Sequence, residues 1–286
     1  MSQLRTALVT GASHGIGYET ARRLAHQGTR VVVHAPTPAE AHAAVARLLR
    51  DDADPGLLHA ASADFRRLGD VTSLARHLGR QHDRLDLLIN NAGALEPPSR
   101  TRDGLDTNFQ INYLAPYALT RLLAPALNTA GGRVVVVASP LHREARLDLD
   151  DLGGDHGRPA DAYAGAQLAL LLFTRALADT AEQRVTAVAV HPGCIDSGTF
   201  AAVYGAGGLP VADGAAHVLH AADPGVEVVN GGYYEGLLPA EPSAEARDGE
   251  APIRLWRATA RLLGWDYTEA QAAAGVPRRS MSARVA

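Results

Sequence analysis

The chain has 286 residues, 47% of them hydrophobic, and a formal net charge of −4 at pH 7. This length supports one large domain with a deep core, and no shift in composition marks an internal boundary. All 27 basic residues are arginine and are spread along the chain, which argues against nucleic acid as a partner. The single cysteine, Cys194, excludes an internal disulfide and fits a reducing compartment.

The two ends of the chain differ in character. Close to Met1 the sequence becomes the apolar run Leu4–Thr10, which is typical of a buried strand and leaves no room for a signal peptide or membrane anchor. We therefore expect a cytoplasmic protein that does not contact a membrane. Residues 1–268 are predicted to form one dinucleotide-binding and catalytic domain, and residues 269–286 a polar, flexible tail.

Short apolar runs alternate with longer amphipathic stretches through most of the chain. The runs predict strands near Arg5–Val9, Thr29–His34, Leu57–Ala61, Leu85–Ile89, Arg133–Ala138 and Arg184–Val190. Gly231–Tyr234 could add a seventh strand, and Ile253–Leu263 is a predicted closing helix, with an irregular stretch, Leu238–Glu250, between them. This alternation predicts an α/β fold with a single doubly wound parallel sheet of about seven strands, of the Rossmann type, with helices on both faces.

A glycine-rich turn joins the first predicted strand to the first helix. Residues 10–17 read Thr-Gly-Ala-Ser-His-Gly-Ile-Gly. Glycines at this point let the backbone approach a pyrophosphate, and the N-terminus of the helix favours its negative charge. The turn therefore predicts nucleotide contacts from six of its residues, namely Gly11, Ser13, His14, Gly15, Ile16 and Gly17.

The spacing of this turn resembles the short-chain dehydrogenase/reductase superfamily, and further segments match that family in the expected order. Asp64-Phe65 follows the third strand, where the family holds the adenine ring, and Asn91-Ala92-Gly93 follows the fourth. The resemblance also implies that a turn near the nicotinamide contains Pro192, Gly193, Ile195 and Ser197.

The segments Leu141-His142, Arg146–Leu152, Gly232-Tyr233-Tyr234, Ala240–Ser243 and Leu255-Trp256 look like the retinol-dehydrogenase-like branch of the family. The similarity extends to about Leu263. It implies the fold firmly and the substrate hardly at all, because the branch is broad.

The resemblance also implies a catalytic set. Tyr163 matches the acid/base of the family, Ser139 the serine that orients the substrate carbonyl, and Asn112 the asparagine that supports a water relay. Gln167 stands where the family has a lysine, and the chain contains no lysine at all. An amide one helical turn from Tyr163 can still bind a ribose hydroxyl, but it cannot supply the charge that favours a tyrosinate. Reduction, which needs a protonated tyrosine, is therefore the favoured direction.

Cofactor choice is encoded weakly. After the second strand the chain has neither an acid at Ala35 to bind a ribose 2′-hydroxyl nor an arginine at Pro36 to bind a 2′-phosphate. His14 occupies a turn position that is often basic in NADP users, and Thr37 could add a hydrogen bond. The sequence therefore favours NADP(H) over NAD(H).

Three other patterns point elsewhere. His217 and His220 have helical spacing but no third ligand, so a packed or surface pair is favoured over a metal site. A Ser139–His142 nucleophile lacks an orienting acid. The uncharged, glycine-rich stretch 198–210 is either a mobile lid over an apolar substrate or a plain flexible loop.

The function expected from the sequence is an NADPH-dependent ketoreductase for an apolar, aromatic or polycyclic ketone of secondary metabolism, with homo-oligomers possible. One alternative is a non-redox catalyst on the same fold, such as a cyclase or dehydratase, whose nucleotide is structural or absent. Another is a protein that senses NADP(H) without turnover, against which the joint presence of Ser139, Tyr163 and Asn112 argues.

Overall fold

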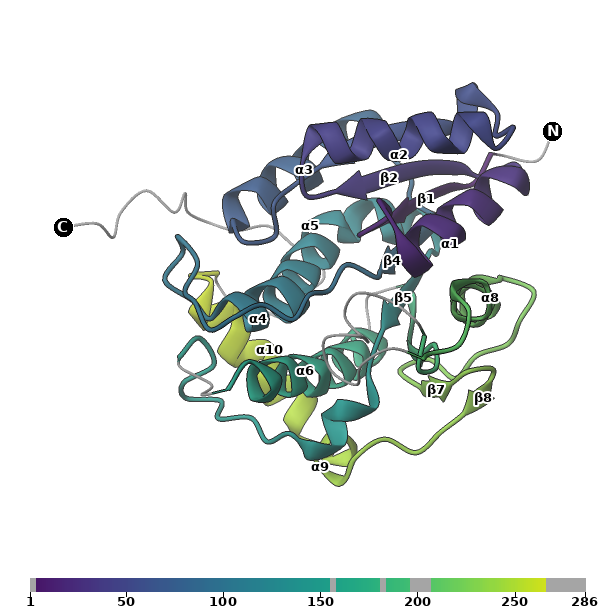
Figure 1. Ribbon diagram of the computed structural model, residues 1–286. Coiled ribbons are helices and arrows are strands. Elements are labelled where there is room, and N and C mark those ends of the chain that lie inside the picture. The colour runs from purple at the N-terminus through teal and green to yellow at the C-terminus, as the bar shows by residue number, and fades with distance from the viewer. Residues whose placement is uncertain (1–3, 155–157, 181–183, 196–206, 266–286) are drawn as a thin grey trace.

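One mostly parallel sheet forms the centre of the molecule. The computed structural model describes residues 4–154, 158–180, 184–195 and 207–265. Its eight strands have the order β3-β2-β1-β4-β5-β6-β7-β8 (Figure 1), and only the pairing of β7 with β8 is antiparallel. The strands are β1 (Thr6–Val9), β2 (Arg30–Ala35), β3 (Leu58–Ser62), β4 (Leu87–Asn90), β5 (Arg133–Val137), β6 (Thr186–His191), β7 (Tyr233–Glu235) and β8 (Leu238–Pro239).

Helices cover both faces of this sheet (Figure 1). One layer consists of α1 (Gly15–His26), α2 (Pro38–Arg50) and α8 (Val211–Ala222). The other consists of α3 (Leu68–Gln81), α5 (Ala115–Ala130) and α6 (Pro159–Asp179), with α10 (Ala251–Leu262) packed on α6. Shorter helical turns are η1 (Pro55–Leu57), α4 (Thr107–Phe109), η2 (Gln110–Leu114), η3 (Pro140–Glu144) and α9 (Ala244–Arg247). The predicted doubly wound fold is confirmed.

The pleat of the strands divides the apolar core between the two faces. In β1, Leu8 packs into the core under α3, α5 and α6, whereas Ala7 and Val9 pack into the core under α1, α2 and α8. Successive side chains of a strand point to opposite faces, so a strand covered on both sides is apolar at most positions. For this reason continuous apolar runs located the strands in the sequence.

The strands and the closing helix lie within about two residues of their predicted positions. The prediction that Leu238–Glu250 is irregular was wrong in part, because this stretch contains β8 and α9. Strand β8 has two residues, and α9 is a single turn that begins where the Ser243 hydroxyl accepts the Ala246 N–H. Elements this short carry no detectable periodicity, so the sequence did not predict them. With β8 the sheet has eight strands, where about seven were predicted.

Within the described ranges, no helix is both long and apolar enough to cross a bilayer.

Candidate active site

A cavity of about 460 Å³ lies beyond the carboxyl ends of the central strands. In an open α/β sheet this edge is the usual place for a ligand. Eighteen of the predicted site residues line the cavity: Gly11, Ser13, His14, Gly15, Ile16, Gly17, Asp64, Phe65, Asn91, Ala92, Gly93, Asn112, Ser139, Tyr163, Gln167, Pro192, Gly193 and Ile195. Ser197 lies outside the described residues, as do residues 198–206 of the stretch considered as a lid.

The glycine-rich turn is packed so tightly that side chains are excluded from it. Gly11 has a φ of +63°, and a Cβ atom there would lie 2.8 Å from the Ala92 Cα. A Cβ atom on Gly17 would lie 2.4 Å from both the Asn91 amide nitrogen and the Gly11 carbonyl oxygen. Glycine is therefore required at both positions, and the backbone is left open toward the cavity.

Hydrogen bonds tie this turn to the end of β4. The Thr10 hydroxyl accepts the N–H groups of Asn91 and Ala92, both at 3.0 Å. The Asn91 side chain donates to the carbonyl oxygens of Thr10, at 2.8 Å, and Gly11, at 3.2 Å. His14, the N-cap residue of α1, makes no side-chain capping bond, and the first turn of α1 contains no acidic residue. The N-terminal N–H groups of this helix are thus available to an anion.

His34 forms part of the wall beside the turn, although the sequence analysis did not select it. Its Nδ1 accepts the Gly11 N–H at 3.2 Å, its Nε2–H donates to the Ala63 carbonyl at 3.1 Å, and its ring stacks on Phe65 with centroids 4.7 Å apart. Burial lowers the pKa of His34 to about 4. The imidazole is therefore neutral at pH 7 and links the loops that follow β1 and β3.

The same wall continues in the loop after β3. The Asp64 carboxylate accepts the Arg66 backbone N–H at 3.0 Å, and the Arg66 side chain forms an ion pair with Glu96 at 2.5 Å. Thr37 does not line the cavity. Its hydroxyl caps α2 by bonding to Glu40, so in the structure it serves the helix rather than the predicted nucleotide contact.

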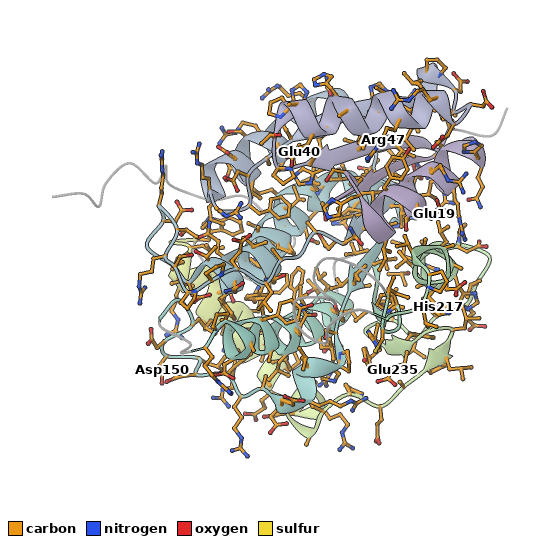
Figure 2. All side chains as sticks on the ribbon, viewed as in Figure 1. Glu19, Glu40, Arg47, Asp150, His217 and Glu235 are labelled. Atoms are coloured by element: carbon orange, nitrogen blue, oxygen red, sulfur yellow. The ribbon has the colours of Figure 1, made fainter. Side chains whose placement is uncertain are left out.

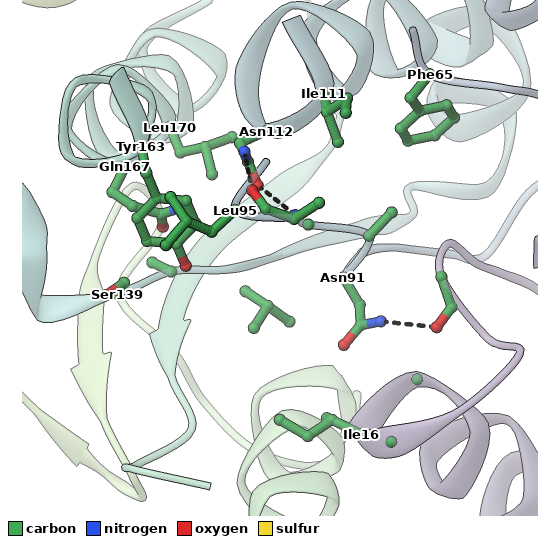
Figure 3. A pocket seen from close by; sticks show the side chains of 18 of the residues that line it. Ile16, Phe65, Asn91, Leu95, Ile111, Asn112, Ser139, Tyr163, Gln167 and Leu170 are labelled. Carbon is green, nitrogen blue, oxygen red and sulfur yellow. Dashed lines mark hydrogen bonds between the residues drawn. The ribbon is translucent and has the colours of Figure 1, made fainter. Parts of the chain in front are cut away.

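The other end of the cavity contains the predicted catalytic residues. Ser139 follows β5, while Tyr163 and Gln167 lie one turn apart on α6. Figure 3 shows the Tyr163 ring pointing toward Ser139. The Ser139 oxygen accepts the Leu141 N–H at 3.3 Å, which leaves its hydroxyl proton to be donated elsewhere.

Asn112 lies on the π-helical turn η2 and is buried. Its Oδ1 accepts the Ala94 N–H at 3.0 Å, and its Nδ2 donates to the Ala94 carbonyl at 2.7 Å (Figure 3). The Nδ2 also donates to the Asn108 carbonyl at 2.7 Å. The side chain thereby holds the loop after β4 against the helix. Its predicted part in a water relay stays a prediction.

Gln167 has a buried polar atom without a hydrogen-bond partner in the described part of the site. Its side chain is 3% exposed, and its Oε1 has no hydrogen-bond partner among the described residues. An orphaned buried acceptor is costly unless a bound molecule donates to it. The cradle made by Gly11 and Gly17 and this unpaired acceptor are compatible with a bound nucleotide that has hydroxyl donors.

Two further histidines support this end of the site. His142 donates from Nδ1 to the Ser139 carbonyl at 2.8 Å and accepts the Ser243 N–H at 3.2 Å, so it does not face the Ser139 hydroxyl. Burial lowers the pKa of both His142 and His191, and His191 lines the cavity. The bond between His142 and Ser243 joins residues 101 positions apart, so the sequence gave no signal for it.

No group of three potential metal ligands occurs in the described parts of the chain. The His217 Nδ1 bonds to the carbonyl oxygen of Pro192, the residue that follows β6, at 2.7 Å. His217 is thus a partly buried residue bonded to a backbone carbonyl.

The sheet order, the glycine-rich turn and the cavity at the carboxyl edge define a nucleotide-binding α/β protein of the Rossmann type. The family model described as short chain dehydrogenase matches residues 5–205. The chain belongs to this family of oxidoreductases, whose members bind nicotinamide cofactors.

Relatives place it in the retinol-dehydrogenase-like part of the family. Dehydrogenase/reductase SDR family member 13 from Bos taurus is 37% identical over 91% of this chain and 73% of its own length. Human retinol dehydrogenase 13 is 31% identical, covering 91% and 85%. A Streptomyces sp. (strain C5) protein, provisionally named daunorubicin C-13 ketoreductase DnrU, is 34% identical, covering 91% and 93%.

A solved structure is also similar. A crystal structure of an uncharacterised protein from Mycobacterium paratuberculosis superposes with a TM-score of 0.75 at 30% identity, covering 90% of this chain and 92% of the other.

Proposed function

We propose that the protein is an NADPH-dependent ketoreductase for an apolar, aromatic or polycyclic ketone. One observation carries the proposal: the glycine-rich turn and the pair Ser139 and Tyr163 line the same cavity. A nucleotide cradle is thereby continuous with a hydroxyl pair that can receive a carbonyl. Similarity to DnrU, whose name describes a ketoreductase, supports carbonyl reduction and a role in secondary metabolism.

Distinct parts of the cavity would hold the cofactor. The turn from Gly11 to Gly17 and the N-terminus of α1 suit the pyrophosphate, and the wall at His34 and Phe65 suits the adenosine. Gln167 Oε1 suits a ribose hydroxyl that needs an acceptor. When bound, the reduced cofactor supplies the hydride.

The hydroxyl groups of Ser139 and Tyr163 would bind and protonate the substrate oxygen. Ser139 accepts a backbone N–H and therefore directs its own proton outward, toward a carbonyl oxygen. Tyr163 would donate the proton that the reduced oxygen needs. Because the chain has no lysine, no lysine ammonium favours the tyrosinate, and the proton stays available for reduction rather than oxidation.

Part of the cavity wall is apolar, which sets the expected substrate class. Aliphatic side chains reach it from several elements: Leu95, Ile111, Leu141, Leu170 and Ile195. Such a wall stabilises rings and alkyl groups by removing them from water, while the polar end fixes the orientation of one carbonyl.

Reduction is tested by following NADPH oxidation and alcohol formation with a panel of aromatic and polycyclic ketones. We expect one molecule of alcohol for each NADPH consumed. Tyr163→Phe should lower kcat by at least about 100-fold because general acid catalysis is lost, while NADPH affinity is kept. Product without NADPH consumption would overturn the proposal in favour of a non-redox catalyst. NADPH binding without turnover on any ketone would favour the sensor.

The role of Gln167 is tested in the reverse direction. Gln167→Lys should raise the rate of alcohol oxidation and move its pH optimum to lower values, because an ammonium favours the tyrosinate. Gln167→Leu, which is neutral and similar in size, serves as the matched control for shape. An unchanged rate and optimum in Gln167→Lys would show that the site works without the lysine function.

A further inference from the structure

Arg47 reaches across from α2 to the glycine-rich turn. It lies in the last turn of α2, and its guanidinium donates to the Ser13 carbonyl oxygen. The guanidinium carbon also lies over the Tyr18 ring, 4.5 Å from its centroid. Figure 2 labels this side chain on the helix at the same end of the molecule as α1. These contacts to Ser13 and Tyr18 restrict the position of a cation beside the turn.

The charge of Arg47 is not neutralised within the described structure, where no carboxylate lies within ion-pair distance of it. The Asp51 carboxylate accepts the Tyr18 hydroxyl at 2.9 Å. The Glu19 carboxylate is paired with Arg22 and Arg23 on α1. An uncompensated guanidinium therefore stands next to the N-terminus of α1, which itself favours anions.

The adjoining rim of the cavity lacks the groups that usually read the adenosine ribose. Ser13, His14 and Pro36 line this rim, and neither Ala35 nor Pro36 can bind a 2′-hydroxyl as an acid or a 2′-phosphate as a base. Arg47 does not itself line the cavity, but its guanidinium is bonded to the backbone of Ser13, which does. The cation available to a phosphate on the 2′-oxygen would therefore be Arg47 on α2 rather than a residue of the loop after β2.

We infer that Arg47 is the residue that recognises the 2′-phosphate of NADP(H), with His14 completing the rim. This inference rests on the proposed use of a nicotinamide cofactor at this site. The guanidinium has five N–H donors in a planar fork that suits phosphate oxygens, and the bond to Ser13 occupies only part of that fork. The Tyr18 ring restricts the side chain and reduces the entropy lost on binding.

Two nucleotide fragments isolate this contact from catalysis. Adenosine 2′,5′-bisphosphate and 5′-AMP differ only in the 2′-phosphate, and both are titrated calorimetrically into the full chain. We expect the bisphosphate to bind more tightly to the wild-type protein. Arg47→Gln should weaken the bisphosphate at least about 10-fold and change 5′-AMP by less than about twofold, as expected for loss of one charge-assisted contact. Arg47→Lys, which keeps the charge but not the fork, should fall between them.

Arg50→Gln is the matched control, because Arg50 is an exposed arginine three residues further along α2 and should leave both affinities unchanged. Equal weakening of both fragments in Arg47→Gln would assign Arg47 a structural role and overturn the inference. So would a wild-type protein that binds the bisphosphate no better than 5′-AMP. Failure of the ketoreductase proposal would look different, since turnover could be absent while the bisphosphate preference and its dependence on Arg47 remained.

Discussion

Acid should destabilise the protein through His34. Burial lowers the pKa of this imidazole from 6.5, its ordinary value, to about 4, because the charged form is removed from water. Between these two values the unfolded chain binds more protons than the native protein, so the free energy of unfolding falls as pH is lowered. The loss begins below the unfolded pKa and is complete below the native one.

The size of the effect follows from the pKa difference. At about 1.4 kcal/mol per pKa unit, a depression from 6.5 to about 4 gives a ceiling of about 3 kcal/mol. The structural cause is clear, since Nδ1 already accepts the Gly11 N–H and the Nε2–H already serves Ala63. A second ring proton would break the bond to Gly11 and leave an unpaired charge beside Phe65.

Urea unfolding at a series of pH values from about 7.5 to about 4.5 measures this loss. His34→Gln removes the titrating group, so the stability gap between wild type and variant should shrink by about 2–3 kcal/mol over that range. Other buried histidines, such as His142 and His191, titrate equally in both proteins and cancel in the difference. Parallel stability curves for the two proteins would refute the reasoning.

Three further outcomes are expected. Gly17→Ala should abolish nucleotide binding measured by calorimetry and destabilise the fold by about 1–3 kcal/mol, because its Cβ would overlap the turn. Gly79→Ala in α3 is the control and should be neutral or stabilising, because the space around Gly79 is open. Equal effects of the two substitutions would contradict the packing argument. Thr10→Val should cost about 1–3 kcal/mol in urea unfolding by leaving two partly buried N–H groups without their acceptor, whereas Thr10→Ser should restore most of this stability. Tyr113→Phe should cost about 1–3 kcal/mol by removing the buried partner of Thr259, and an unchanged midpoint would show that water replaces it.

Local chemistry explains what could be predicted from the sequence. The glycine-rich turn is defined by residues within eight positions, and the strands by apolar runs that the two-sided burial of the sheet requires. Tyr163 and Gln167 are placed together by the period of one helix. These features need no knowledge of which distant segments meet.

The contacts of His34 and Arg47 could not be predicted, because they join segments that are distant in the sequence and adjacent in the fold. His34 reaches Gly11 and Ala63 only because β2 lies between β1 and β3. Arg47 reaches Ser13 only because α1 and α2 lie on the same face. Thr37 shows the opposite case, in which a residue expected to serve the ligand is engaged by its own helix through Glu40.

Strand β8 also determines how the sheet ends. This outermost strand has two residues, and one of them, Pro239, has no N–H to offer to an incoming strand. Such a short, proline-containing border gives a neighbouring chain almost no backbone ladder to extend, which protects the protein from aggregation along this side of its sheet. Self-association, if it occurs, is therefore expected to use helical surfaces rather than continuation of the sheet past β8.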